Sequence, residues 1–422
     1  MLASFDRRQA LALAPALLAA ACSRNGNPAD MTPAQRLQTL VDAPALSRAP
    51  AAGIVLIQNG EIIASDAVGF AQGLSSEEAQ SDIEPALFTI DQPFRAASIS
   101  KLAVALLCAR LSVAGVIDLD ADIRNWGVSL PSSPVIDEAT LTPRALLAHL
   151  SGLEDPDAYW NAHPGTLYEL LIEQPPTSSS GTSGWFHYCN LNYGILATAL
   201  EHRTGRRFDT LIQEHVIGPM GLDAGFNWAG ASLSKRRTAA TLYRETEEGW
   251  AIQIDGPNVK FGSNPMLLLE AGADQIPYTP GQNGTLFSPQ GGLRASLADL
   301  AKLVDVVARE PVLIDPVWTA NSDMSNGDTD AGYFTGYGSG VHLYDKASSF
   351  WPDVELAGHH GEAYGLYAGA WHAPALDLSF AYAVTGTPED GPGEADHPAL
   401  NGFTSPLVDA VRDAYMESAA ST

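Results

Sequence analysis

A serine and a lysine three positions apart, Ser98 and Lys101, begin an apolar stretch that contains neither Gly nor Pro until Gly115. This pattern predicts a buried helix of about fifteen residues that starts near the serine. Residues three apart lie on one helical face, so the lysine amine can reach the serine hydroxyl. A serine becomes a nucleophile when a base takes its proton, and a lysine whose pKa is lowered by burial can be that base. The dipole at a helix N-terminus also favours the negative charge that develops during such an attack.

The same spacing occurs a second time, at Ser232 and Lys235. There the lysine runs directly into Arg236 and Arg237, and no apolar helix follows. A Ser-x-x-Lys pattern is expected about once by chance in a chain of this length. The context therefore favours Ser98 as the nucleophile and a solvent-exposed surface for the second copy.

A tyrosine and an asparagine two positions apart, Tyr188 and Asn190, precede another apolar helical pattern in FHYCNLNYGILATALEHRTG (186–205). A tyrosine beside an ammonium group can pass a proton, because the cation favours the phenolate. A similar pair, Tyr159 and Asn161, lacks both the preceding aromatic residue and the apolar helix. We expect the first pair to be the functional one.

These segments resemble the class C β-lactamases and their relatives, the family VIII carboxylesterases and the penicillin-binding proteins. The resemblance implies that Tyr188 shares the base and acid role with Lys101, and that Asn190 positions the lysine and the substrate amide. Further segments resemble the family in the family's own order, so that the resemblance covers residues 36 to 415: LLAHLSGL (146–153), VIGPMGLDAGFNW (216–228) and SPQGGLRASLADLAKL (288–303).

The third motif of this family, Lys-Thr-Gly on a strand, corresponds here to His359-His360-Gly361. The resemblance places the oxyanion hole at the backbone N–H groups of Ser98 and Glu362, and such donors typically contribute about 10²–10³ each in rate. Gly361 allows close approach of the substrate backbone. In the family the lysine helps to bind a substrate carboxylate, and a mostly neutral histidine weakens that anchor. The acidic Glu362 departs from the family pattern.

The strand signals lie at the two ends of the chain. Two β-prone runs flank Asn59-Gly60, which predicts a hairpin. Strand-like runs follow at 337–344, 364–372 and 377–385, with a closing helix from Pro406 to Met416. We therefore predict an α+β fold, β-lactamase/transpeptidase-like by resemblance, over residues 36–422. The terminal strands would complete one antiparallel sheet that is flanked by helices, and a helix-rich region would be inserted between them.

The first 22 residues have the pattern of an export signal. Arg7 and Arg8 resemble a twin-arginine signal, and Cys22 after three alanines resembles a lipoprotein cleavage site. Residues 23–35 are polar and small, and are expected to form a linker. No later segment reaches 18 uninterrupted apolar residues, so we expect no membrane-spanning helix. The expected location is outside the cytoplasm, either in the periplasm or, through a lipid anchor at Cys22, on a bacterial membrane.

Composition and motifs exclude several other classes of function. The chain has 49 acidic and 23 basic residues and a formal net charge of -26, which disfavours nucleic-acid binding. Neighbouring histidines on a strand point to opposite faces, so His359 and His360 cannot share a metal, and no other metal or cofactor motif is present. Cys108, Cys189 and His149 are expected to be structural.

The sequence predicts a serine hydrolase that forms an acyl-enzyme on an ester or amide carbonyl and needs no cofactor. A carboxylesterase or a peptidase acting on a small-molecule or peptide substrate is favoured. A β-lactamase or a cell-wall D-peptide hydrolase is the alternative. A further alternative is a non-catalytic envelope binding protein, but the presence of all the catalytic residues argues against it.

Overall fold

A nine-stranded antiparallel sheet joins the two ends of the chain in the computed structural model. The model describes residues 31–43, 50–71, 86–157, 159, 165–178, 184–226, 228, 230–246, 249–253, 278–363, 365–388 and 395–420. The strand order is β11-β12-β13-β14-β15-β16-β1-β2-β3, so the first long strand lies beside the last one. Strand β1 (Ala51–Gln58) pairs antiparallel with β16 (Leu378–Thr385), as Ile54 opposite Tyr382 illustrates. The predicted α+β class and the joining of the terminal strands are confirmed.

The predicted hairpin is present at Asn59-Gly60. Strand β1 turns into β2 (Glu61–Ala71), with Gln58 opposite Glu61. Asn59 and Gly60 both have positive φ angles, 53° and 79°. Two such residues fit a turn whose twist matches that of the flanking strands.

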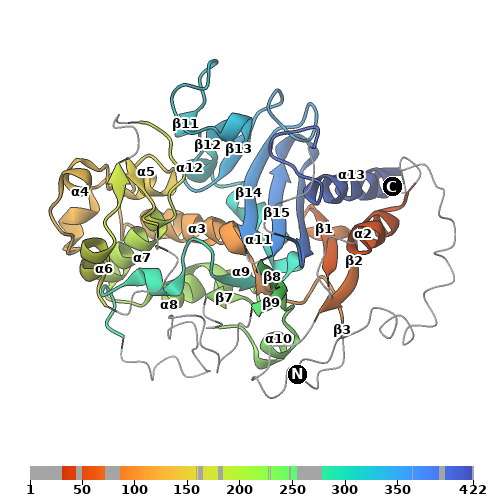
Figure 1. Ribbon diagram of the computed structural model, residues 1–422, viewed down its shortest axis with the longest axis horizontal. Coiled ribbons are helices and arrows are strands. Elements are labelled where there is room, and N and C mark those ends of the chain that lie inside the picture. Colours follow the sequence, from red (N-terminus) through yellow and green to blue (C-terminus); the bar gives the residue numbers. More distant parts are fainter. Residues whose placement is uncertain are drawn as a thin grey trace.

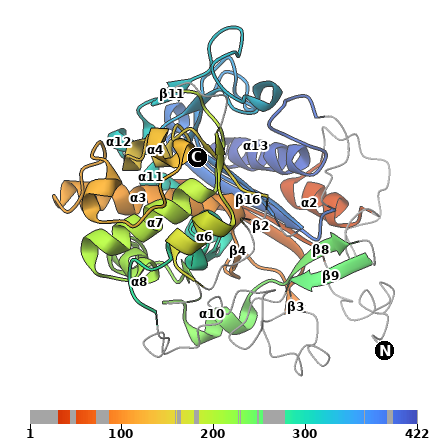
Figure 2. The same ribbon diagram turned by 60° about the vertical axis from the view of Figure 1, so that its left-hand side comes forward.

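Each face of the sheet is covered by helices, which explains why β1 is an unbroken apolar run. Val55 and Ile57 pack into one buried cluster, and Ile54 and Leu56 into a second one on the opposite face, because successive side chains alternate. Helices α2 (Pro33–Val41) and α13 (Thr404–Ala420) cover the second face, and α11 (Leu297–Val307) and α3 (Ser100–Val113) cover the first. Figure 2 shows α2 and α13 side by side across the strands.

Two boundaries differ from the sequence prediction. Helix α2 begins at Pro33, inside the stretch expected to be a linker, because Thr32 and Gln35 form a capping box. The run expected at 337–344 is two short strands, β12 (Gly336–Tyr337) and β13 (His342–Tyr344). They are separated by a tight turn in which Gly340 has a φ of 83°. Residues 1–30, with the expected export signal, lie outside the described residues.

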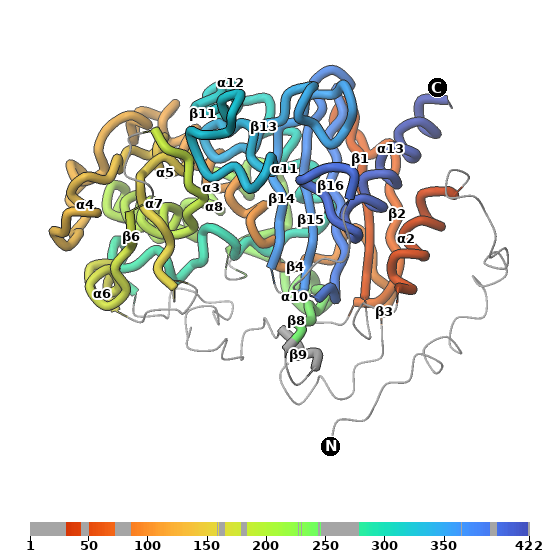
Figure 3. Tube along the Cα trace, turned by 45° about the horizontal axis from the view of Figure 1, so that its top comes forward, coloured from red at the N-terminus to blue at the C-terminus, as the bar shows by residue number. Residues whose placement is uncertain are grey.

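A helix-rich region lies between the sheet-forming ends of the chain, and most of its helices are on the left in Figure 1. Its helices are α4 (Pro134–Glu138), α5 (Pro143–Leu147), α6 (Leu167–Glu173), α7 (Leu191–Thr204), α8 (Phe208–Ile212), α9 (Gly218–Met220) and α10 (Leu233–Thr238). The traces in Figure 3 show this region beside β14, so the predicted insertion of helices between the terminal strands is confirmed.

The remaining strands and helices are short except for β14 and β15. The strands are β3 (Ala86–Leu87), β4 (Phe94–Arg95), β5 (Leu153–Glu154), β6 (Thr177–Ser178), β7 (Gly225–Phe226), β8 (Leu242–Thr246), β9 (Gly249–Gln253), β10 (Leu293–Ala295), β11 (Trp318–Thr319), β14 (Leu356–Ala363) and β15 (Leu366–Ala373), and the further α-helix is α12 (Pro311–Ile314). In the described part of the chain, no helix is both long enough and apolar enough to cross a membrane.

Candidate active site

Ser98 lies in a single turn of 3-10 helix, Ala97–Ile99, that leads directly into the buried helix α3. Ala97 has a φ of 46°, in the left-handed region that non-glycine residues seldom adopt. Ser98 is partly exposed, whereas Ala97 and Ile99 on either side are buried. The turn therefore presents the hydroxyl of Ser98 at the surface of an otherwise closed core.

Lys101 is fully buried one turn along α3. Its Nζ lies 3.1 Å from Ser98 Oγ, 2.9 Å from Asn190 Oδ1 and 3.1 Å from the carbonyl oxygen of Gln290. Burial lowers its pKa from 10.5 to about 7, and the charge of Asp155 opposes this shift. The predicted approach of Lys101 to Ser98 is present, together with two acceptors for the lysine.

Tyr188 also lies beside Ser98, in the segment just before α7. Its hydroxyl hydrogen-bonds to Ser98, and its ring centroid is 4.7 Å from Lys101 Nζ. Burial raises its pKa above the ordinary value, and the hydrogen bond to Ser98 opposes this shift. Tyr188 is therefore a neutral phenol that contacts the serine and lies close to the lysine amine.

The imidazole of His149 holds the Tyr188 ring in place. The two rings stack at 4.3 Å with an interplanar angle of 27°. His149 Nδ1 accepts a hydrogen bond of 3.0 Å from the backbone N–H of Cys189, which fixes the segment that carries the tyrosine. His149 is buried and does not reach Ser98 through any described hydrogen bond, in agreement with a structural role.

Asp155 is a residue of the site that the sequence interpretation missed. Its carboxylate accepts hydrogen bonds from the backbone N–H and the side-chain Nδ2 of Asn190, 2.9 Å each. It also accepts from the backbone N–H of Leu191 at 2.7 Å and from Cys189 Sγ at 3.3 Å. An acidic side chain at a helix N-terminus satisfies backbone donors there, and this one does so from 35 residues away. No local pattern in the sequence could have indicated it.

The third predicted segment forms β14, which runs beside the Ser98 turn. A Cβ atom at Gly361 would lie 2.8 Å from the carbonyl oxygen of Ala96, so only glycine fits at this approach. His359 is buried, and both of its ring nitrogens have partners: Nδ1 lies 2.5 Å from the carbonyl oxygen of His360, and Nε2 lies 2.7 Å from Tyr337 Oη. Burial lowers the pKa of His359, and the charge of Lys101 lowers it further by a smaller amount. A neutral ring that donates from Nδ1 and accepts at Nε2 has no N–H to offer a substrate.

A pocket of about 960 Å³ opens onto these groups. Its lining includes Ser98, Tyr188, Asn190, His359 and Glu362. It thus brings five of the seven predicted site residues to one cavity, with Lys101 behind Ser98 and Gly361 within the strand that forms the wall.

The competing motifs have other roles. Ser232 caps helix α10, and its Oγ binds Asp223 Oδ2 at 2.7 Å. The amine of Lys235 binds the carbonyl oxygen of Asp91. Tyr159 donates to Gln290 Oε1 at 3.3 Å, and Asn161 lies outside the described residues.

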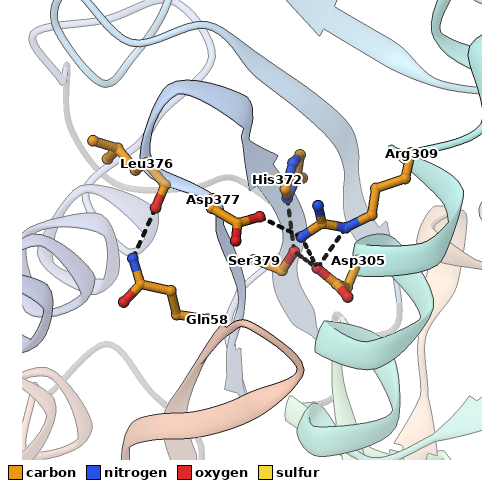
Figure 4. Close-up of polar contacts among 7 residues, drawn as sticks. All are labelled: Gln58, Asp305, Arg309, His372, Leu376, Asp377 and Ser379. Atoms are coloured by element: carbon orange, nitrogen blue, oxygen red, sulfur yellow. Dashed lines mark hydrogen bonds and ion pairs between the residues drawn. The ribbon is translucent and has the colours of Figure 1, made fainter.

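A second group of serine, histidine and aspartate lies where α11 meets the β15–β16 hairpin (Figure 4). Ser379 Oγ donates to Asp305 Oδ1 at 2.8 Å and lies 2.9 Å from His372 Nδ1. The serine thus stands between the other two residues, so the aspartate does not orient the histidine as in a hydrolase triad. Ser379 is fully buried, and Arg309 links Asp305 to Asp377 across the hairpin. This network ties the helix to the sheet.

The described residues contain no group of three or more His, Cys, Asp or Glu side chains that could hold a metal ion. His359 and His360 have different partners: His360 lies 3.4 Å from Tyr344 Oη, with its ring 4.6 Å from that of Trp371.

Comparison with known proteins identifies the family. The sequence model of the beta-lactamase family matches residues 37–402. Esterase EstB of Burkholderia gladioli is 26% identical over 413 residues, which cover 90% of this chain and 94% of the esterase. A D-aminopeptidase of Cereibacter sphaeroides is 23% identical over 365 residues, and the match spans only 58% of its length.

Solved structures agree on the fold. A D-amino acid amidase from Ochrobactrum anthropi SV3 superposes with a TM-score of 0.59 at 18% identity, over 92% of this chain and 98% of the amidase. A β-lactamase/D-alanine carboxypeptidase from Yersinia pestis superposes with a TM-score of 0.58 at 15% identity, over 92% and 98% of the two chains. The chain therefore belongs to the beta-lactamase family and is a serine hydrolase of that family.

Proposed function

We propose that Ser98 is the nucleophile of an ester or amide hydrolase and that Lys101 is its base. The observation that carries this proposal is the set of neighbours around Lys101 Nζ. Two of them, Asn190 Oδ1 and the Gln290 carbonyl, can only accept hydrogen bonds. A neutral amine gives its two N–H groups to these acceptors, and its lone pair is left for the proton of Ser98, 3.1 Å away.

The reaction proceeds in two steps through an acyl-enzyme. Lys101 accepts the Ser98 proton while Oγ attacks the carbonyl carbon, and the backbone N–H groups of Ser98 and Glu362 stabilise the oxyanion. Tyr188 passes a proton to the departing alcohol or amine and is reprotonated through Lys101. Water then attacks the acyl-enzyme with the same groups as base and acid, which releases the acid and restores Ser98.

A carboxylesterase or a peptidase fits this site better than a β-lactamase. The nitrogens of His359 are both engaged within the protein, so the histidine does not replace the lysine that would anchor a substrate carboxylate. The lining of the pocket contains no Lys or Arg among its described residues. The similarity to an esterase and to a D-aminopeptidase supports the same choice.

We also propose that the chain is exported with residues 1–22 as its signal. Cys22 is then a candidate for lipidation, and the hydrolase domain follows, with its expected start at residue 36 moved to Pro33, where α2 begins. The apolar stretch after Arg7 and Arg8 supports this location. Radiolabelled palmitate incorporated into the wild type but not into Cys22→Ser would establish the lipid anchor, and its absence in both would leave simple secretion.

The function is tested by initial rates of the full chain on a short-chain p-nitrophenyl ester and, in parallel, on a chromogenic cephalosporin. We expect ester hydrolysis that is lost in Ser98→Ala and retained in Ser232→Ala. Fast turnover of the cephalosporin would instead identify a β-lactamase. Turnover of neither substrate, together with cleavage of muropeptides, would identify a cell-wall D-peptide hydrolase.

A further inference from the structure

The charged side chains that line the active-site pocket are mainly acidic. Three of its lining residues are acidic, Asp328, Asp330 and Glu362, and none of those described is Lys or Arg. Three lining histidines do not compensate for this charge, because burial lowers the pKa of His342, His359 and His360. The fourth, His187, is already paired with Asp328. The pocket in front of Ser98 is therefore anionic.

The carboxylates reach the pocket from two separate parts of the fold. Asp328 and Asp330 belong to the segment between β11 and β12, and Glu362 lies near the end of β14. Within the described part of the chain, neither Asp330 nor Glu362 forms an ion pair with a Lys or Arg side chain. Burial and the charge of Asp328 raise the pKa of Asp330, and burial raises that of Glu362. The charge of His187 opposes the first shift, and a hydrogen bond with Tyr367 opposes the second.

Two further observations indicate that this charge faces a ligand. The pocket opens onto the hydroxyl of Ser98, which makes it a ligand site independently of its carboxylates. One lining side chain, His342, hydrogen-bonds to the backbone of Tyr333 while its buried Nε2 has no partner in the described structure. The neutral ring donates to the Tyr333 carbonyl, so Nε2 is an unused acceptor. This nitrogen and the carboxylates of Asp328, Asp330 and Glu362 are acceptors in the lining, and they are complementary to a ligand that donates hydrogen bonds.

The geometry points to a substrate that carries a positive charge, such as a free amino group, close to the scissile ester or amide bond. This inference rests on the proposed function, because it takes Ser98 as the nucleophile. An anionic pocket attracts a cation and repels a carboxylate, and the effect weakens as salt screens the exposed part of the charge. The inference goes beyond hydrolysis of esters and amides in general, since it assigns a charge to the substrate.

The test compares pairs of substrates that differ only in charge. The first pair consists of the p-nitrophenyl ester of γ-trimethylammonio-butanoate and its all-carbon isostere, which has a tert-butyl group in place of the trimethylammonium. The second pair consists of alanine p-nitroanilide and its N-acetyl derivative, each as both enantiomers. We expect kcat/KM for the cationic member of the ester pair to exceed that of the neutral member about tenfold or more at low salt, and the ratio to shrink as salt is added.

Variants assign this preference to the pocket. In Asp330→Asn we expect the ratio of cationic to neutral kcat/KM to fall severalfold, mainly through a higher KM for the cationic ester. The matched control is Glu355→Gln, which removes an exposed carboxylate just before β14 and is expected to leave the ratio unchanged.

A ratio of one or less in the wild type, or the wild-type ratio in Asp330→Asn, would overturn the inference while leaving the hydrolase intact. Absence of Ser98-dependent turnover for the esters and the anilides alike would instead contradict the proposed function. Ser98-dependent turnover thus separates the two failures, and the anilide pair shows whether the preference extends to amides.

Discussion

The carboxylate of Asp155 holds the side-chain amide of Asn190 in one orientation. Asp155 Oδ2 accepts from Asn190 Nδ2 at 2.9 Å, so the other end of that amide, Oδ1, faces Lys101 Nζ at 2.9 Å. A flipped amide would present N–H groups to the lysine amine and would compete for its lone pair. Asp155 therefore acts on Ser98 only through Asn190 and Lys101, and it is a positioning residue.

Replacing Asp155 with Asn is predicted to reduce kcat about 10- to 100-fold with a smaller change in KM, because the chemistry depends on the base that Asn190 orients. The charge of Asp155 also raises the pKa of Lys101. Its removal should therefore move the acidic limb of the pH–rate profile to lower pH. Asp155→Glu should recover part of kcat. A reduced rate with an unshifted profile would mean that the residue is only structural.

The pH dependence of the wild type follows from the state of Lys101. Its pKa is lowered to about 7 by burial, and the neutral form is the one that can accept the Ser98 proton. Activity should therefore be low below this pH, rise through about 7 and level off above it. Rates on an uncharged ester, followed at the isosbestic wavelength of p-nitrophenol, measure this limb. A rate that falls with rising pH through the same range would show that protonated Lys101 is the active form.

The nucleophile can be assigned by comparing variants of Ser98 and Ser232, each of which lies three positions before a lysine. Ser98→Ala and Lys101→Ala should each lower kcat/KM by several orders of magnitude, about 10³-fold or more. Ser232→Ala should retain activity, since it removes a helix cap, which contributes about 1 kcal/mol to stability, and a hydrogen bond to Asp223 that lies outside the pocket. Mass spectrometry of the protein treated with a fluorophosphonate should find the adduct on the peptide with Ser98. An inactive Ser232→Ala with an active Ser98→Ala would reverse the assignment.

Gly361 should not tolerate a side chain. A Cβ atom there would lie 2.8 Å from the Ala96 carbonyl oxygen and 3.1 Å from Ile99 Cγ1, so β14 must move away from the Ser98 turn. Because the proposed oxyanion donors lie on these two segments, we expect Gly361→Ala to lower kcat about 10²-fold or more. Circular dichroism and thermal unfolding that match those of the wild type would show that the variant is folded. Normal kcat would show that the oxyanion site lies elsewhere.

The buried group at Ser379 is predicted to affect stability and not catalysis. Ser379→Ala leaves His372 Nδ1 and Asp305 without their shared partner, which should cost about 1–3 kcal/mol in the free energy of unfolding. Denaturant unfolding monitored by circular dichroism measures this loss, while kcat/KM at a temperature below the transition should be unchanged. Loss of activity in a folded Ser379→Ala would indicate that this network communicates with the pocket.

Features that depend on residues close together in the chain could be predicted from the amino-acid sequence. Ser98 and Lys101 lie on one face because helical spacing requires it, and Asn59-Gly60 forms a hairpin because these residues accept positive φ. The family motifs located β14 and the segment before α7 in the same way. The start of α2 at Pro33 was missed by a few residues. The capping box of Thr32 and Gln35 is a local signal, but the polar composition of this stretch favoured a linker.

The remaining contacts of the site depend on how distant segments pack in three dimensions. Asp155, the Gln290 carbonyl and Tyr337 come from distant segments, and each forms its contact only after the helical region has packed against β14. The meeting of Asp330 with Glu362 in one pocket likewise depends on the path of loops between strands. Periodicity and turn chemistry specify local backbone geometry. Which distant polar groups meet is decided by the packing of the whole core, which a single sequence does not reveal.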